Sequence, residues 1–126
     1  MSEPIPAAEL AARFVTLCTR GGAGRDWPRK QRDRWILLRV IQARLVSEAP
    51  LGEREVTARL QDWLLGPGRD FAIDAVSLRR ALVDEGFLDR DDYGREYRVS
   101  SRHERRVRFE DLPPDLDARV ASRRAT

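Results

Sequence analysis

Cysteine and histidine are nearly absent from this sequence of 126 residues, which has only Cys18 and His103. One cysteine cannot close an intramolecular disulfide, so nothing indicates an oxidising compartment. The two residues have no metal-ligand spacing, and the glycines at 21–24 lack the lysine that follows in a phosphate-binding loop. We therefore expect no cofactor, no metal and no enzyme, with catalysis by carboxylates alone as a remote alternative.

Long hydrophobic runs are absent as well. The longest unbroken aliphatic or aromatic run is Trp35–Leu38, far short of a membrane span. The N-terminus lacks a basic region followed by an apolar stretch, so it does not resemble a secretory signal. These absences predict a cytoplasmic protein that does not contact a membrane.

Lysine is also scarce, with Lys30 the only lysine among 24 basic residues. Such a preference for arginine is typical of a GC-rich genome and is weak evidence for phosphate binding. Charge as a whole is abundant, since 36% of residues are charged against 41% hydrophobic, enough for one modest core. The charge is sorted along the chain: Arg25–Arg44 has a net charge of +5, Asp70–Asp92 of −4 and Arg95–Arg108 of +4.

Apolar periodicity divides the chain into an N-terminal helix with a glycine-rich joint (1–24), a central domain (25–100) and a charged tail (101–126). The expected helices are Pro6–Thr19, Arg29–Val46, a helix that starts after Gly52, Ala75–Glu85 and, in the tail, Asp115–Arg124. Cys18 lies on the apolar side of the first helix and is interpreted as a buried filler.

The segment Val76–Val99 is the most informative part of the sequence. A helical apolar period follows a plausible N-cap at Asp74 and stops at Gly86, and a hairpin of Leu88–Arg90 and Glu96–Val99 comes next. Helix, glycine stop and hairpin in this order are typical of the second half of a winged helix-turn-helix. The predicted fold class is α+β, mostly α: a winged helix-turn-helix-like domain with a short β-hairpin, an N-terminal helix and a charged C-terminal tail.

The region Trp27–Val99 also follows a recognisable pattern of charged, glycine and aromatic positions. The matching residues are Pro28, Lys30, Glu53, Glu55, Val56, Asp74, Leu78, Arg79, Arg80, Leu82, Val83, Asp84, Gly86, Leu88, Arg90, Gly94 and Tyr97. On these residues the sequence resembles the prokaryotic domain of unknown function number two-zero-eight-seven, which occurs alone or fused behind ArsR-type transcriptional regulators. The resemblance implies a winged-helix-like fold in a regulatory setting, without a known ligand or catalytic residues.

Three positions depart from the pattern of that family. Its Tyr-Ser/Thr pair is Leu51-Gly52 here, its Asn is Thr57, and its Trp after the closing Tyr is Arg98. A binding role that rests on those residue types is therefore not carried over to this chain.

The third helix of the predicted domain is a poor DNA reader. Arg79 falls on its apolar side, where we expect a structural ion pair with Glu55 or Asp74, and the exposed Arg80 is followed four residues later by Asp84. Carboxylates dominate the helix entry and the hairpin, and they oppose contact with phosphates.

Two surfaces remain as candidates. The first is an interaction surface made of an exposed aromatic anchor and a negative patch, namely Trp27, Asp70, Asp84, Asp89, Asp91 and Asp92. The second, less favoured, is a nucleic-acid surface on the basic segments, namely Arg29, Lys30, Arg32, Arg34, Arg102, Arg105, Arg106 and Arg108. The sequence thus favours a non-catalytic regulatory or accessory module in a transcription-related setting, which binds a protein partner or ligand or associates with itself.

Overall fold

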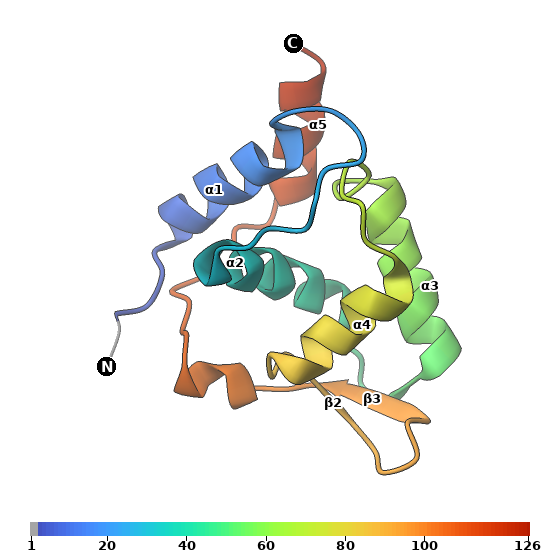
Figure 1. The fold of residues 1–126 in the computed structure, drawn as a ribbon. Helices are drawn as coiled ribbons and strands as arrows, with labels where there is room; N and C mark the ends of the chain where they lie inside the picture. Colours follow the sequence, from blue (N-terminus) through green and yellow to red (C-terminus); the bar gives the residue numbers. More distant parts are fainter. Residues whose placement is uncertain (1–2) are drawn as a thin grey trace.

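Amphipathic segments separated by glycine, proline and aspartate turns fold into an α+β structure, which the computed structural model describes for residues 3–126 (Figure 1). In chain order the elements are α1 (Ala7–Thr19), α2 (Gln31–Gln42), η1 (Ala43–Leu45), β1 (Leu51–Gly52), α3 (Glu53–Leu65), α4 (Ala75–Asp84), β2 (Leu88–Arg90), β3 (Glu96–Val99), η2 (Arg102–Arg105) and α5 (Leu116–Arg124). The helices η1 and η2 are short 3-10 turns.

The three strands form a small antiparallel sheet in the order β1-β3-β2. The hairpin has the bounds predicted from the sequence, and its register pairs Leu88 with Val99 and Arg90 with Tyr97. Gly94 supplies the positive φ of 66° that its turn needs. On its other edge β3 pairs with β1, where Leu51 lies opposite Tyr97.

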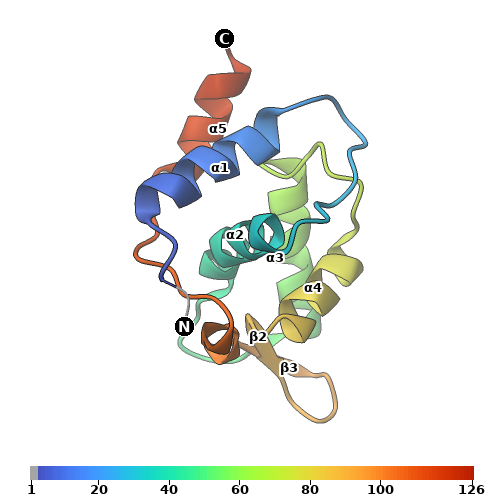
Figure 2. The same cartoon turned by 60° about the vertical axis from the view of Figure 1, so that its left-hand side comes forward.

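Helix α2 is the centre of the structure and lies between α1 and α4 (Figure 2). Its buried apolar residues are Ile36, Leu37, Leu38, Val40 and Ile41. The predicted range Arg29–Val46 is too long, because the backbone stays extended up to the N-cap Lys30 and the last turn tightens into η1.

Both ends of α4 have the predicted caps. The backbone N–H of Ser77 donates to the Asp74 carboxylate at 2.7 Å. At the other end Gly86 has a φ of 86°, and the N–H groups of Gly86 and Phe87 donate to the carbonyls of Val83 and Leu82. These two bonds form a Schellman motif, which turns the chain sharply into β2.

The segment after Ser100, predicted as a charged tail with a short helix, packs against the rest of the protein. The His103 ring stacks on Phe87 with centroids 4.1 Å apart, and Val107, Leu116 and Val120 are buried. Ile5 forms a parallel bridge with Phe109, and α5 packs on α1 (Figure 1). The short helix of the predicted tail is present as α5, and the apolar residues of the segment complete the core.

Candidate binding groove between α4 and the hairpin

A small groove lies between the exposed side of α4 and the hairpin, with a volume of about 190 Å³. It is lined by Val76, Arg79, Arg80, Val83 and Asp84 of α4 and by Arg90 and Tyr97 of the hairpin. Three of these side chains are guanidinium groups, which donate hydrogen bonds in a fixed planar geometry and recognise carboxylates or phosphates. The groove therefore has the chemistry to bind an anionic group.

Arg79 is held in place within the groove. Its guanidinium donates to the hydroxyl of Thr57 at 2.7 Å and forms an ion pair with Glu53 at 3.1 Å. It also lies over the Tyr97 ring, 5.6 Å from the centroid, and only 15% of its side chain is exposed. The predicted structural ion pair exists, but its partners differ, because Glu53 rather than Glu55 or Asp74 faces α4.

The two residues proposed as partners of Arg79 have other contacts. Glu55 accepts a hydrogen bond from Arg59 one turn later at 2.9 Å. Asp74 caps α4, and the N–H of Ser77 lowers the pKa of its carboxyl. Asp74 therefore keeps a negative charge at the N-terminal end of α4, where a helix that reads the major groove would approach the bases.

Arg80 and Arg90 form no ion pair within the described part of the chain, and both residues are exposed. Asp84 lies between them along the lining of the groove. Counting Glu53, the ion-pair partner of Arg79, the site has three positive and two negative groups. The sequence did not predict that Arg90 and Tyr97 line a groove. Their pairing across the hairpin follows from its register and could have indicated that they lie side by side.

The five aspartates expected to form one negative patch do not all lie together. Asp70 lies 3.6 Å from Arg124 of α5, whereas Asp89 of β2 pairs with Arg102 at 2.6 Å. Helix α5 and strand β2 lie at opposite ends of the protein (Figure 1). Asp91 accepts a hydrogen bond from the N–H of Arg95, which holds the hairpin turn and lowers the pKa of the Asp91 carboxyl. Asp84 and Asp92 remain exposed, and Asp89 and Asp91 line a common hollow of the hairpin.

Trp27 is not the exposed anchor that the sequence predicted. Its ring contacts Phe71 edge to face with centroids 5.3 Å apart, and the residue is half-buried against the core. Arg25 pairs with Phe71 in an isolated bridge, which draws the segment before α2 onto the loop after α3. This contact between distant parts of the chain covers the indole.

The basic segments are partly used in internal contacts. Arg32 pairs with Glu9, and Arg34 donates to the carbonyl of Arg29, so Arg29 and Lys30 are the exposed remainder of the first cluster. In the second cluster Arg102 donates to the carbonyls of Val83 and Leu88, and Arg106 donates to that of Glu85. Arg105 is exposed, and Arg108 is also exposed but engaged in a contact.

The arginines of the second cluster thus have a structural use that the sequence did not reveal. Arg102 and Arg106 bind the carbonyl groups at the C-terminal end of α4, where the helix dipole favours cations. These hydrogen bonds join the segment after Ser100 to α4, which forms one side of the groove.

Two observations concern metal ligands and the cysteine. Among residues 3–126 no group of three His, Cys, Asp or Glu side chains is placed to hold a metal ion. Burial raises the pKa of the Cys18 thiol to about 12, so the thiol is protonated near neutral pH. The arrangement supports binding through guanidinium groups and an aromatic ring.

Comparison with known families identifies the central part of the chain. Residues 25–99 match the family model described as uncharacterized protein conserved in bacteria, DUF2087. The protein belongs to this family. Comparison with curated proteins and with solved structures gave no match.

The DUF2087 match agrees with the resemblance carried by the sequence pattern, and it covers the groove completely. The groove-lining residues Arg79, Arg80, Val83, Asp84, Arg90 and Tyr97 are all positions on which that resemblance rests. Helices α1 and α5 lie outside the matched range. Within residues 3–126, no helix has the length and apolarity needed to cross a bilayer.

Proposed function

We propose that residues 31–99 form a winged helix-turn-helix. The order α2-β1-α3-α4-β2-β3 supports this assignment, as does the sheet order β1-β3-β2, in which the hairpin is the wing. In such a domain α4 takes the place of the third helix, which contacts the macromolecule that the domain binds. The groove between α4 and the wing is then the natural contact surface.

We infer that the protein is a non-catalytic regulatory or accessory module in a transcription-related setting, and that it binds a protein partner through this groove. The observation that carries the inference is the set of three guanidinium groups, of which Arg79 is fixed by Thr57, Glu53 and Tyr97. Arg80 and Arg90 stay free to bind acidic side chains of the partner.

A protein partner fits this surface better than nucleic acid, because the charge around the groove is mixed. The site itself has three positive and two negative groups, and Asp74 adds a further charge at the helix entry. Binding a polyphosphate requires many phosphates to be neutralised, which this set of charges does not do. The exposed Tyr93 at the wing tip, with Arg95 packed 5.4 Å from its ring centroid, adds residue types that are common in protein interfaces.

The test is affinity capture from the bacterial host with wild-type protein and with the double variant Arg80→Glu/Arg90→Glu. Arg98→Glu is the matched control, since Arg98 is an exposed arginine next to Tyr97 in β3 and does not line the groove. We expect a protein that the wild type and the control retain and that the double variant loses by at least about tenfold. Equal recovery with all three proteins would contradict the proposal.

A titration with labelled duplex DNA decides the second candidate function. The protein-binding proposal predicts no retardation of the duplex at low salt. Retardation that weakens steeply with salt and persists in Arg80→Glu/Arg90→Glu would instead support nucleic-acid binding through the basic segments.

A further inference from the structure

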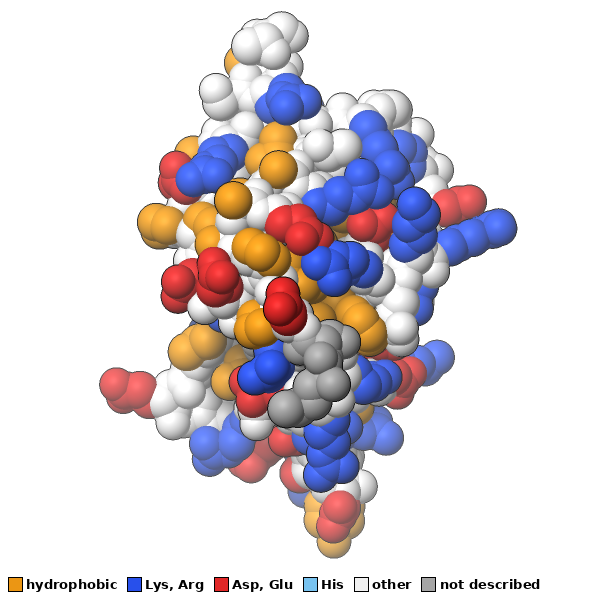
Figure 3. Space-filling view, turned by 90° about the vertical axis from the view of Figure 1, so that its left-hand side faces the viewer, with side chains coloured by type: hydrophobic (Ala, Val, Ile, Leu, Met, Phe, Trp, Pro, Cys, Tyr) orange, Lys and Arg blue, Asp and Glu red, His pale blue; other side chains and the backbone are white. Residues whose placement is uncertain are grey.

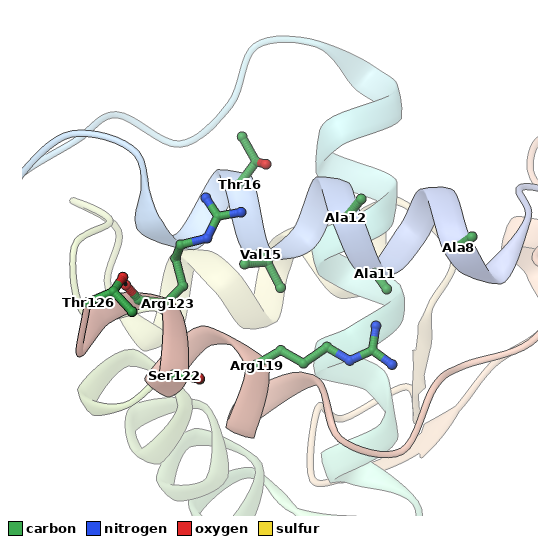
Figure 4. Close-up of a pocket in the computed structure, with 9 residues that line it drawn as sticks. All are labelled: Ala8, Ala11, Ala12, Val15, Thr16, Arg119, Ser122, Arg123 and Thr126. Carbon is green, nitrogen blue, oxygen red and sulfur yellow. Dashed lines mark hydrogen bonds between the residues drawn. The ribbon is translucent and has the colours of Figure 1, made fainter.

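A second and larger groove lies between α1 and α5, away from the α4–hairpin site. It is shallow and open to solvent, with a volume of about 650 Å³. One side consists of Ala8, Ala11, Ala12, Val15 and Thr16 of α1 (Figure 4). The other consists of Arg119, Ser122 and Arg123 of α5 and of Thr126, which follows the helix. Figure 3 faces this part of the molecule and shows hydrophobic side chains at the surface with charged side chains beside them.

The shape of the groove suits a helix. On α1 the lining residues recur at helical spacing, and none is larger than valine. Small side chains let the axis of a third helix come within the usual packing distance of about 8–10 Å. Apolar side chains of such a helix would cover Ala8 and Ala12, which are exposed in this structure.

The charge of the groove selects the partner. The arginines Arg119 and Arg123 extend from α5 toward α1 (Figure 4). Arg119 is paired with Asp115 at 3.0 Å, but Arg123 forms no side-chain ion pair within residues 3–126.

The carboxylates of the two helices are already engaged. Glu9 of α1 pairs with Arg32, Asp117 of α5 pairs with Arg44, and Asp115 is the partner of Arg119. Glu110, close to the start of α1, accepts a hydrogen bond from the N–H of Ala7 at 3.4 Å. The charge left without a partner in the groove is therefore the positive charge of Arg123.

We propose that the α1–α5 groove binds an amphipathic helix of a partner protein that has small apolar residues on one side and acidic residues beside them. Its acidic residues pair with Arg123, and its apolar residues cover the alanines of α1. A second copy of this chain is a poor occupant, because the carboxylates of its own α1 and α5 are already engaged in ion pairs and leave none for Arg123. All residues of this site lie outside residues 25–99, so it is a binding surface separate from that of the DUF2087 domain.

The proposal is tested with two labelled helix-forming peptides of about 16 residues, long enough to be helical in solution. Both have alanine and leucine on one side, and the flanking positions are glutamate in one peptide and lysine in the other. Fluorescence anisotropy measures their binding to the full-length protein. We expect the glutamate peptide to bind at least about tenfold more tightly than the lysine peptide.

Two variants locate the binding surface. Arg123→Glu removes the unpaired charge, and Ala12→Tyr fills the groove at an exposed helix position. Each should weaken binding of the glutamate peptide by about tenfold or more, while the control Arg98→Glu, with the same charge change, leaves it unchanged. Circular dichroism checks that each variant is folded.

Three results would overturn the proposal. The first is equal affinity for both peptides, and the second is affinity for the glutamate peptide that neither groove variant changes. The third is a dimer in sedimentation experiments that Ala12→Tyr abolishes and Arg123→Glu does not weaken, because the groove would then bind a second copy.

Discussion

Arg79 shows how one residue links the fold to the groove, since it joins α4 to α3 and lies over Tyr97 of the hairpin. Replacement of Arg79 by alanine should lower the free energy of unfolding by about 1.5–3 kcal/mol, the range for a hydrogen bond to a charged group. A larger loss is not expected, because the carboxylate of Glu53 is 54% exposed and water can solvate it.

Urea denaturation of Arg79→Ala and Arg80→Ala measures this difference. Arg80 is the next residue on the same helix and is exposed, so its replacement should change stability by less than about 0.5 kcal/mol. Equal losses in the two variants would show that Arg79 has no special structural role.

His103 makes the stability of the protein depend on pH. Burial lowers the pKa of His103 below its ordinary value of 6.5, although the nearby Glu104 opposes the shift. The unfolded state therefore binds the proton more tightly than the folded state does. The contribution of neutral His103 to the free energy of unfolding is fully present above about pH 6.5, and it is lost as the pH falls to the pKa that His103 has in the folded protein. Arg39 also faces His103 and acts in the same direction as burial.

Unfolding midpoints measured between about pH 8 and pH 5 test this dependence. His103→Phe can keep the stacking on Phe87 but does not titrate, so its midpoint should fall less over the same range. The same slope for both proteins would assign the effect to other groups.

At the scale of an element, the C-terminal end of α4 depends on glycine. Any other residue at position 86 would have to adopt the φ of 86°, and its Cβ would lie 2.8 Å from the backbone nitrogen of His103. Gly86→Ala should therefore destabilise the protein by at least about 1–2 kcal/mol, the cost of the left-handed conformation alone.

Gly22→Ala is the control for this prediction. Gly22 has no positive φ, and a Cβ there would meet no atom within 4 Å. Its replacement should be neutral or should stabilise the protein by up to about 1 kcal/mol, through the lower entropy of the unfolded chain. A thermal melt in which Gly86→Ala equals Gly22→Ala would contradict the assignment of the Schellman motif.

At the scale of the whole molecule, the segment after Ser100 is part of the core. Val107, Leu116 and Val120 are buried, and side-chain burial contributes about 1.5–3 kcal/mol for each. The sum is comparable with the total stability of a domain, about 5–15 kcal/mol. A chain that ends at Ser100 should therefore lose cooperative unfolding and its near-ultraviolet circular dichroism.

The exposed Arg105 in the same segment provides the control, because Arg105→Ala should unfold within about 0.5 kcal/mol of the wild type. If a chain that ends at Ser100 were stable, the domain predicted from the sequence for residues 25–100 would fold without the segment that follows it. In that case the segment would be an accessory rather than a part of the core.

Local chemistry in the sequence determined the elements and their ends. The sequence alone identified Asp74 and Gly86 as the caps of α4, and it identified the residues of the hairpin from Leu88 to Val99. Capping, glycine conformation and the alternation of apolar and polar residues all act over a few residues, so they can be read locally. The family pattern in residues 25–99 could be read for the same reason. The start of α2 was less predictable, since Pro28 permits a helix start without requiring one.

Tertiary structure alone decided which charged and aromatic residues meet. Glu53 rather than Glu55 faces Arg79, Asp70 and Asp89 lie at opposite ends, and Trp27 is covered by Phe71. Long charged side chains reach several partners at little difference in energy, so their pairing follows the packing of the helices. The two grooves likewise arise from elements that are distant in sequence, and no local pattern specifies how closely such elements approach.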